Sequence, residues 1–228
     1  MKGRTPWNKG LTKDNHPSLM KMSLTMSGRM QSNFRKWEVA HPVYYAQLER
    51  SPDSAEFYGV LLGDGCVERY PRTEKLTLCF NSKEQKRIGR LAKLTEEIFK
   101  KKPTIRIRKD SKCVDVYLYQ KHISSRLDFP TGIKIRHELR VPAWIKRSNL
   151  HLVRCLKGMF ESDGNLCVDS NNHTCVIKYT SYNHSLLEDV YNALLRLGYN
   201  PQFRHRDVRL ARKLEVAKFI ELISFSKD

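Results

Sequence analysis

One short pattern occurs twice in this chain. Residues 56–65 have the sequence EFYGVLLGDG, and residues 156–164 have the sequence LKGMFESDG. Each copy is a mostly apolar stretch that ends in Asp-Gly, which predicts a short helix whose last residue is the aspartate. The glycine that follows suits the left-handed conformation that often closes a helix. The duplication predicts two similar helices, one in each half of the chain.

Small residues recur four positions apart in both copies. Gly59 and Gly63 share one face of the first predicted helix, while Gly158 and Ser162 share one face of the second. Such a face has little side-chain bulk, so another helix can pack against it almost backbone to backbone. We therefore expect the two helices to pack on each other.

The two repeated aspartates are the candidate metal ligands. If the helices pair with their C-termini at the same end, Asp64 and Asp163 meet across the interface. Like charges repel, and a helix C-terminus also disfavours a carboxylate. A divalent cation would offset both costs, and carboxylate oxygens favour Mg²⁺, with Mn²⁺ or Ca²⁺ as substitutes. The alternative is that Asp-Gly only stops each helix, but the shared register of two copies favours a metal site.

These two segments resemble the signature helices of the LAGLIDADG homing endonucleases in their single-chain form, from about residue 54 onward. The resemblance implies that the helices pack at a pseudo-two-fold axis and that their last acids, Asp64 and Asp163, bind the metals that cut both DNA strands. The sequence departs mildly from the family pattern: Tyr58 and Lys157 replace a small residue, and Leu62 replaces an acid that does not bind metal.

Each signature helix is followed by the same order of predicted elements. The first set comprises strands at 66–69 and 75–80, a helix at 83–102, strands at 104–109 and 113–119, and a helix at 121–129. The second comprises strands at 167–169 and 174–181, a helix at 185–197, strands at 202–207 and 208–212, and a helix at 215–225. An internal duplication is the simplest explanation.

The predicted fold class is therefore α+β. We expect two pseudo-symmetric αββαββα lobes, the LAGLIDADG homing endonuclease fold, whose sheets form a saddle over duplex DNA. The predicted domains are a basic extension and linker, the first lobe, an inter-lobe linker and the second lobe, at residues 1–53, 54–139, 140–150 and 151–228.

Arginines alternate with apolar residues on the second strand pair of each predicted lobe. Alternation places Arg106 and Arg108 together on the sheet face opposite the core, and Arg204, Arg206 and Arg209 recur two or three apart in the second lobe. Such a ribbon can lie in a major groove with arginines on guanine edges or phosphates. The alternative is that these are ordinary surface arginines.

Phosphodiester hydrolysis also needs a cation near the phosphate. In the family, a basic residue just after the closing helix of each lobe approaches the active site. By that position the resemblance implies catalytic roles for Lys134 and Lys227, although mere surface charge remains the alternative for each.

The net charge of the chain is strongly positive. There are 42 Lys and Arg against 24 Asp and Glu, a formal charge of +18, and the usual partner of such a surface is nucleic acid. Near the N-terminus, Lys9 and Lys13 lie in a turn-rich basic segment that suits contact with a phosphate backbone. It also resembles the short PWNKG-type DNA-binding motifs attached to homing nucleases. The alternative is a flexible basic arm that becomes ordered on DNA.

The six cysteines form no C-x-x-C pair, which argues against structural zinc. The N-terminus has no apolar signal segment, and no stretch suits a membrane span. We expect a soluble intracellular protein, in the cytoplasm, nucleoid or an organelle matrix, with buried, reduced thiols.

The sequence thus predicts a metal-dependent, monomeric, site-specific DNA endonuclease with a long double-stranded target. The alternative is a protein on the same scaffold that binds without cutting, such as an intron RNA maturase or a DNA-binding regulator.

Overall fold

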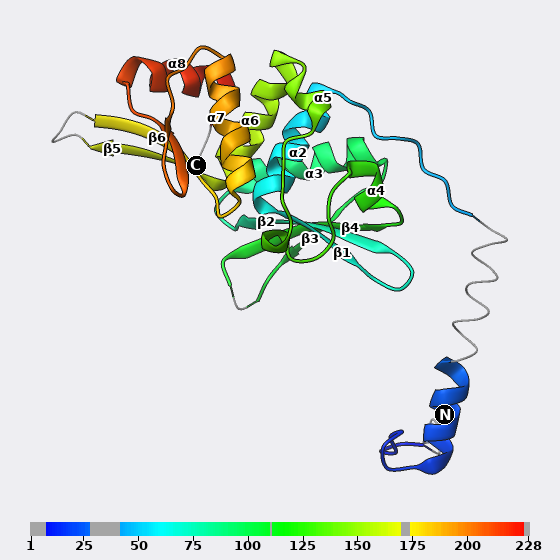
Figure 1. The fold of residues 1–228 in the computed structure, drawn as a ribbon. Helices are drawn as coiled ribbons and strands as arrows, with labels where there is room; N and C mark the ends of the chain where they lie inside the picture. Colours follow the sequence, from blue (N-terminus) through cyan, green and yellow to red (C-terminus); the bar gives the residue numbers. More distant parts are fainter. Residues whose placement is uncertain (1–7, 28–41, 110, 170–173, 226–228) are drawn as a thin grey trace. The chain divides into compact units, whose positions relative to one another are not determined.

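A computed structural model describes residues 8–27, 42–109, 111–169 and 174–225. The chain divides into two compact units, Met1–Ala46 and Gln47–Asp228 (Figure 1). In the first unit, a turn at residues 8–10 is followed by a helix at residues 17–27. This helix is not predicted from the sequence, because its three methionines, Met20, Met22 and Met26, do not follow a helical repeat.

The second unit contains both predicted lobes, and their element order is the predicted one (Figure 1). The first lobe comprises α2 (Pro52–Asp64), β1 (Gly65–Arg69), β2 (Glu74–Asn81), α3 (Gln85–Phe99), β3 (Thr104–Ile107), β4 (Cys113–Gln120) and α4 (Ile123–Leu127). The connection to the second lobe includes the 3₁₀ helix η1 (Lys134–Arg136) and α5 (Ala143–Lys146).

The second lobe repeats this arrangement with shorter strands at its far end. It comprises α6 (Asn149–Asp163), β5 (Gly164–Asp169), β6 (Thr174–Thr180), α7 (His184–Arg196), β7 (Gln202–Phe203), β8 (Asp207–Leu210) and α8 (Lys213–Ile223). The two four-stranded antiparallel sheets have the orders β1-β2-β4-β3 and β5-β6-β8-β7. The predicted α+β fold of two similar lobes is confirmed.

Burial alternates along the strands and defines two faces of each sheet. In β2, Leu76, Leu78 and Phe80 are buried, while the residues between them are partly exposed. The buried face lies under the helices of its own lobe (Figure 1). The opposite face of each sheet therefore carries the more exposed side chains.

The last strand pair of the second lobe differs from its prediction. The predicted strands 202–207 and 208–212 shorten to β7 and β8, with a turn closed by a 2.8 Å hydrogen bond from the amide of Arg204 to the carbonyl of Asp207. The turn has no Gly, Pro or Asn, so nothing in the local sequence marked it.

Helices α2 and α6 pack through their small residues, as predicted. A Cβ atom built on Gly59 would lie 2.1 Å from the Cys155 carbonyl oxygen, and one on Gly158 would lie 2.3 Å from the Glu56 carbonyl oxygen. Both distances are far shorter than any real contact, so no other residue fits at either position. The two helices approach backbone to backbone and join the lobes.

The prediction of left-handed glycines after the two aspartates is wrong. Gly65 has φ −96° and Gly164 has φ −80°, both in extended conformations from which a strand begins at once. Glycine is required for a different reason: a Cβ on Gly164 would lie 2.2 Å from the Phe160 carbonyl oxygen, and one on Gly65 would lie 2.5 Å from Leu61 Cδ1.

Replacement of a helix-interface glycine should destabilise the protein. We expect Gly59→Ala to lower the free energy of unfolding by at least about 2 kcal/mol, because overpacking against rigid backbone forces the helices apart. The matched control is Gly89→Ala on α3, where an added Cβ meets nothing within 4 Å. That change should stabilise by about 0.5–1 kcal/mol. Chemical denaturation measures both, and equal stability of the two variants would contradict the packing described above.

Candidate metal centre and nucleic-acid interface

Asp64 and Asp163 are the last residues of α2 and α6, and the helices end side by side. A Cβ on Gly63 would lie 2.4 Å from Ser162 Cβ and 3.2 Å from Asp163 Oδ2. The carboxylate of Asp163 therefore lies against the end of the helix that carries Asp64. The structure brings together the two acids that the sequence singled out.

Arg87, in the first turn of α3, binds this pair of helix ends. Its guanidinium donates to Asp64 Oδ2 at 2.9 Å, to Ser162 Oγ at 2.9 Å and to Glu84 Oε2 at 2.7 Å. The Arg87 side chain is only 10% exposed, so its charge acts in a poorly solvated position. It reduces the repulsion that two adjacent carboxylates would otherwise experience.

Lys134, in η1, is the second cation at this centre. Its Nζ donates to the carbonyl oxygen of Leu62 at 2.9 Å and to that of Gly63, in the last turn of α2. Burial lowers the pKa of Lys134, while the nearby Asp163 and Asp64 act in the opposite direction. The structure thus brings Lys134 to the aspartates, as the sequence predicted.

The donor set of this centre fits a hard cation bound jointly with a substrate. Among the described residues, no group of three or more His, Cys, Asp or Glu side chains could hold a metal ion. Magnesium, however, is usually bound by one or two carboxylates, with water and substrate phosphates supplying the other oxygens. Asp64 and Asp163 could hold such a cation with a phosphate group.

A network of ion pairs behind Arg87 holds α3 against both signature helices. Arg90 pairs with Glu56 of α2 and, at 2.5 Å, with Glu161 of α6. Arg154 of α6 pairs with Glu56 at 2.8 Å. Glu56 and Glu161 are 0% and 2% exposed, so each buried charge requires its partners. Because Arg90 is one turn from Arg87, the network also positions the Arg87 guanidinium.

Two arginines differ from the other basic residues of the predicted helix at 83–102. Arg87 and Arg90 point into the interface between the lobes and pair with carboxylates there. Both lie on the same face of α3, three residues apart. Nothing else in the local sequence distinguishes them from the neighbouring lysines.

On the first sheet, Arg106 and Arg108 share one face, as predicted. Both bind Asp115 of β4: Arg106 at 2.8 Å, and Arg108 through two nitrogens at 2.7 and 3.0 Å. Asp115 is 1% exposed, and the hydrogen bonds from Arg108 hold its pKa at about 2. Asp115 has no local sequence signal, because its contacts are made across strands.

The apolar residues between these arginines do not reach the core. Ile105 and Ile107 are 51% and 70% exposed, because β3 is the edge strand of the sheet and its outer side is uncovered. The side chains of β3 therefore alternate between the two sheet faces, as predicted, but its apolar side chains are not buried.

The three arginines predicted on the second ribbon do not act as one group. Arg204 and Arg206 lie in the turn between β7 and β8, and the Arg206 guanidinium lies over the Tyr182 ring at 4.8 Å. Arg209 lies in β8, where its Nε donates to Gln202 Oε1 at 2.9 Å. Only Arg209 is on the sheet itself.

The remaining predicted site residues are in the terminal segments. Lys9 and Lys13 are exposed in the turns that precede the helix at 17–27. Lys227 lies outside the described residues.

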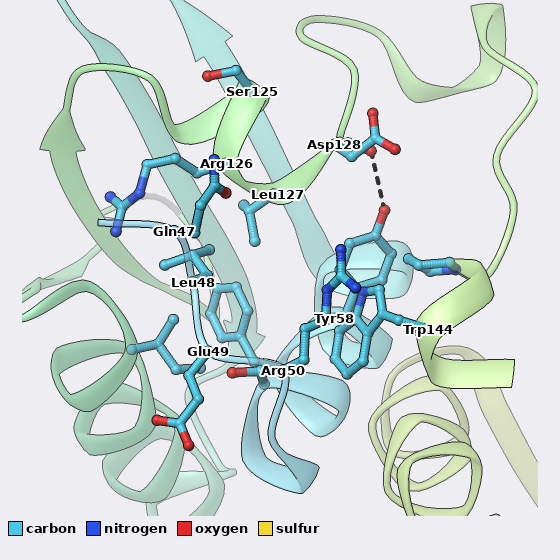
Figure 2. Close-up of a pocket in the computed structure, with 14 residues that line it drawn as sticks. Gln47, Leu48, Glu49, Arg50, Tyr58, Ser125, Arg126, Leu127, Asp128 and Trp144 are labelled. Carbon is cyan, nitrogen blue, oxygen red and sulfur yellow. Dashed lines mark hydrogen bonds between the residues drawn. The ribbon is translucent and has the colours of Figure 1, made fainter. Parts of the chain in front are cut away.

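A pocket at the opposite end of α2 is separate from the aspartate pair. Its wall includes Tyr58, Asp128 and Trp144, together with the segment Gln47–Arg50 that leads into α2 (Figure 2). The Tyr58 hydroxyl donates to the Asp128 carbonyl oxygen at 3.3 Å. Tyr58, which replaces a small residue of the signature pattern, thus fixes α2 to the end of α4.

Two further expectations concern the cysteines and membranes. All six cysteines are free thiols, but only Cys155 is buried and Cys167 is exposed, so the expectation of buried thiols is wrong for most of them. None of the helices in the described parts of the chain has the length and apolar character needed to cross a membrane.

Sequence comparisons connect the second lobe with a known family. Residues 151–224 match the LAGLIDADG-like domain family. The chain is also 27% identical over 206 residues to the replication factor C small subunit of Methanocaldococcus jannaschii. That match covers 84% of this chain but only 10% of the other protein, so the chain spans about a tenth of the length of this curated relative.

Structural comparisons identify the fold. Mesophilic variants of the homing endonuclease I-DmoI are similar with a TM-score of 0.54 at 18% identity, over 77% of this chain and 97% of theirs. I-DmoI in complex with DNA and Mn gives 0.52 at 18% identity, over 78% and 98%. The N-terminal LAGLIDADG domain of DUF199/WhiA gives 0.53 at 13% identity, over 79% and 84%. The chain has the LAGLIDADG homing endonuclease fold.

The pair of arginines on Asp115 should make stability depend on pH. The folded-state pKa of Asp115, about 2, is below its ordinary value of 3.8, so its stabilising contribution is complete above about pH 4 and is lost as pH falls toward 2. We expect Asp115→Asn to destabilise by about 2 kcal/mol at pH 7, since both arginines are half exposed. Denaturation of both proteins between pH 7 and pH 3 should show the difference narrowing below about pH 4. A difference that does not change with pH would exclude the ion pairs as its cause.

Proposed function

We propose that this protein is a divalent-metal-dependent endonuclease that cuts both strands of a specific DNA site. The observation that carries the proposal is the pairing of α2 and α6, which ends in two acids from two lobes at one point. A cation held there by Asp64 and Asp163 would supply Lewis acidity and activate water for attack on a phosphate. One acid from each of two similar lobes suits the two strands of a duplex.

The acids and the cations of this centre would have different roles in hydrolysis. Asp64 and Asp163 bind and orient the cation and the phosphate that shares it. Lys134 and Arg87 place positive charge where charge develops on the phosphate during attack. Hydrolysis adds water across one P–O bond, and the leaving oxygen takes up a proton, so no oxidant or further cofactor is required.

The two sheets would hold the duplex. Their polar faces carry Arg106 and Arg108 in the first lobe and Arg209 in the second, and a long target site follows from using both lobes. The chain already contains both lobes, so we propose that a monomer acts on DNA. Lys9 and Lys13 would add phosphate contacts outside the saddle.

One contact favours the alternative of a protein that binds nucleic acid without cutting. The Arg87 guanidinium already binds Asp64, so this carboxylate is partly neutralised without a cation. In an endonuclease, Arg87 would have to release Asp64 to a cation, and its guanidinium could then bind the phosphate. The following two experiments distinguish these possibilities.

Removal of either metal-binding carboxylate should abolish cutting and spare binding. We expect Asp64→Asn and Asp163→Asn to lose cleavage of a randomised duplex library in Mg²⁺ by at least about 100-fold, while selecting the same bound sequences in Ca²⁺. Sequencing of cut ends and of the bound fraction measures both. Retained cutting by both variants would refute the assignment, and a wild-type protein that binds but never cuts would establish the alternative.

Removal of the Arg87 charge should affect both the rate and the metal dependence. We expect Arg87→Gln to slow cleavage at saturating Mg²⁺ by about 100-fold, as for loss of one donor to a developing oxyanion. The Mg²⁺ concentration for half-maximal rate should fall, because the competing guanidinium is gone. The control is Lys86→Gln, an exposed neighbour on the same turn. An unchanged metal dependence would show that Arg87 does not compete with the cation.

A further inference from the structure

Four polar residues, one from each strand, form a row across the second sheet. The register pairs Asn165 of β5 with Lys178 of β6, Lys178 with Arg209 of β8, and Arg209 with Gln202 of β7. The residues on either side of Lys178 and Arg209 are all fully buried: Ile177, Tyr179, Val208 and Leu210. Because side chains alternate along a strand, the row lies on the face opposite the core.

The row lies next to the metal centre. Asn165 is two residues after Asp163, and the strand register carries the row from that point to the far edge of the sheet. On a duplex held by the two sheets, these residues would face base pairs close to the cut.

One hydrogen bond fixes the chemistry of the outer half of the row. Arg209 Nε donates to Gln202 Oε1 at 2.9 Å. This contact uses one of the two lone pairs of Gln202 Oε1 and leaves the amide nitrogen as a donor for a ligand. Lys178 and Arg209 present donors only, and Gln202 presents its amide donor with one remaining lone pair on the oxygen.

A row of donors matches guanine better than any other base. In the major groove guanine presents two acceptors, N7 and O6, whereas adenine presents one acceptor and one donor. Adenine would thus meet the donors of Lys178 and Arg209 with a donor of its own. Glutamine recognises adenine through its oxygen and nitrogen together, and here Arg209 Nε already donates to that oxygen.

The equivalent row of the first lobe has different chemistry. Cys66 follows Asp64 by two residues, as Asn165 follows Asp163, and the register continues through Thr77 and Tyr117 to Thr104. None of these four side chains carries a charge at neutral pH. The two lobes therefore present unlike rows at pseudo-equivalent positions beside the cut.

We propose that Lys178, Arg209 and Gln202 read neighbouring G·C pairs in the half-site under the second lobe, close to the cut, and that the equivalent pairs under the first lobe carry no such guanine preference. The proposal rests on the proposed function, in that it requires binding to duplex DNA, but it does not require cutting.

The test is selection of bound duplexes from a randomised library in Ca²⁺, with the wild-type protein and three variants. Arg209→Gln removes the central donor, and we expect it to reduce the preference for guanine at one base pair by about tenfold or more. Arg212→Gln is the matched control, because it loses the same charge at an exposed position outside the sheet. Thr77→Ala alters the equivalent row of the first lobe. Any change that it causes in base preference should appear in the half-site under the first lobe.

The outcomes separate the inference from the function on which it rests. No enriched sequence for the wild-type protein would refute duplex binding itself. An enriched site without guanine at the positions that respond to Arg209→Gln, or an unchanged preference in that variant, would refute only the donor row. Equal weakening of all sequences by Arg209→Gln and Arg212→Gln would show that Arg209 contacts phosphate and not bases.

Discussion

The close approach of α2 and α6 is the constraint on which the rest of this structure depends. Gly59 and Gly158 lie directly against the carbonyl groups of the opposite helix, and no side chain separates the two backbones. Two helices this close that end together must also bring their terminal residues together. This packing has an electrostatic cost, because it places the carboxylates of Asp64 and Asp163 side by side. The same packing, which joins the lobes, also sets the position of the candidate metal centre.

The charges around this interface are balanced by cations from a neighbouring helix and a connecting segment. Arg87 binds Asp64 from α3, and Lys134 binds the last carbonyls of α2 from η1. Arg90 anchors the same helix α3 through two buried glutamates. The first lobe and the connecting segment after it thus supply the two cations described at the centre, whereas the second sheet supplies the row of donors beside it. The halves are alike in fold and different in chemistry.

The features that could be predicted from the sequence are those that its repeated local patterns specify. The duplicated motif identified both helices and both aspartates, and strand patterns gave the element order of each lobe. It could not select Arg87 among the basic residues of its helix, because the contact with Asp64 joins residues far apart in the chain. Asp115 was hidden because its contacts with Arg106 and Arg108 are made across paired strands. The predicted left-handed conformation of Gly65 and Gly164 is wrong. Glycine is required at both positions because a Cβ atom would clash with the preceding helical turn, and not because the backbone is left-handed.

The ion pairs between α2 and α6 also bear on how a duplicated protein keeps its two halves together. When Gly59 is matched with Gly158, the position of Arg154 corresponds to Ala55, and that of Glu161 corresponds to Leu62. Two copies of the first lobe would leave Glu56 with Arg90 but without Arg154, and two copies of the second would leave Glu161 with Lys157 but without Arg87 and Arg90. Each lobe thus depends on cations of the other to neutralise its buried glutamate fully, so unlike halves suit this interface better than identical ones would.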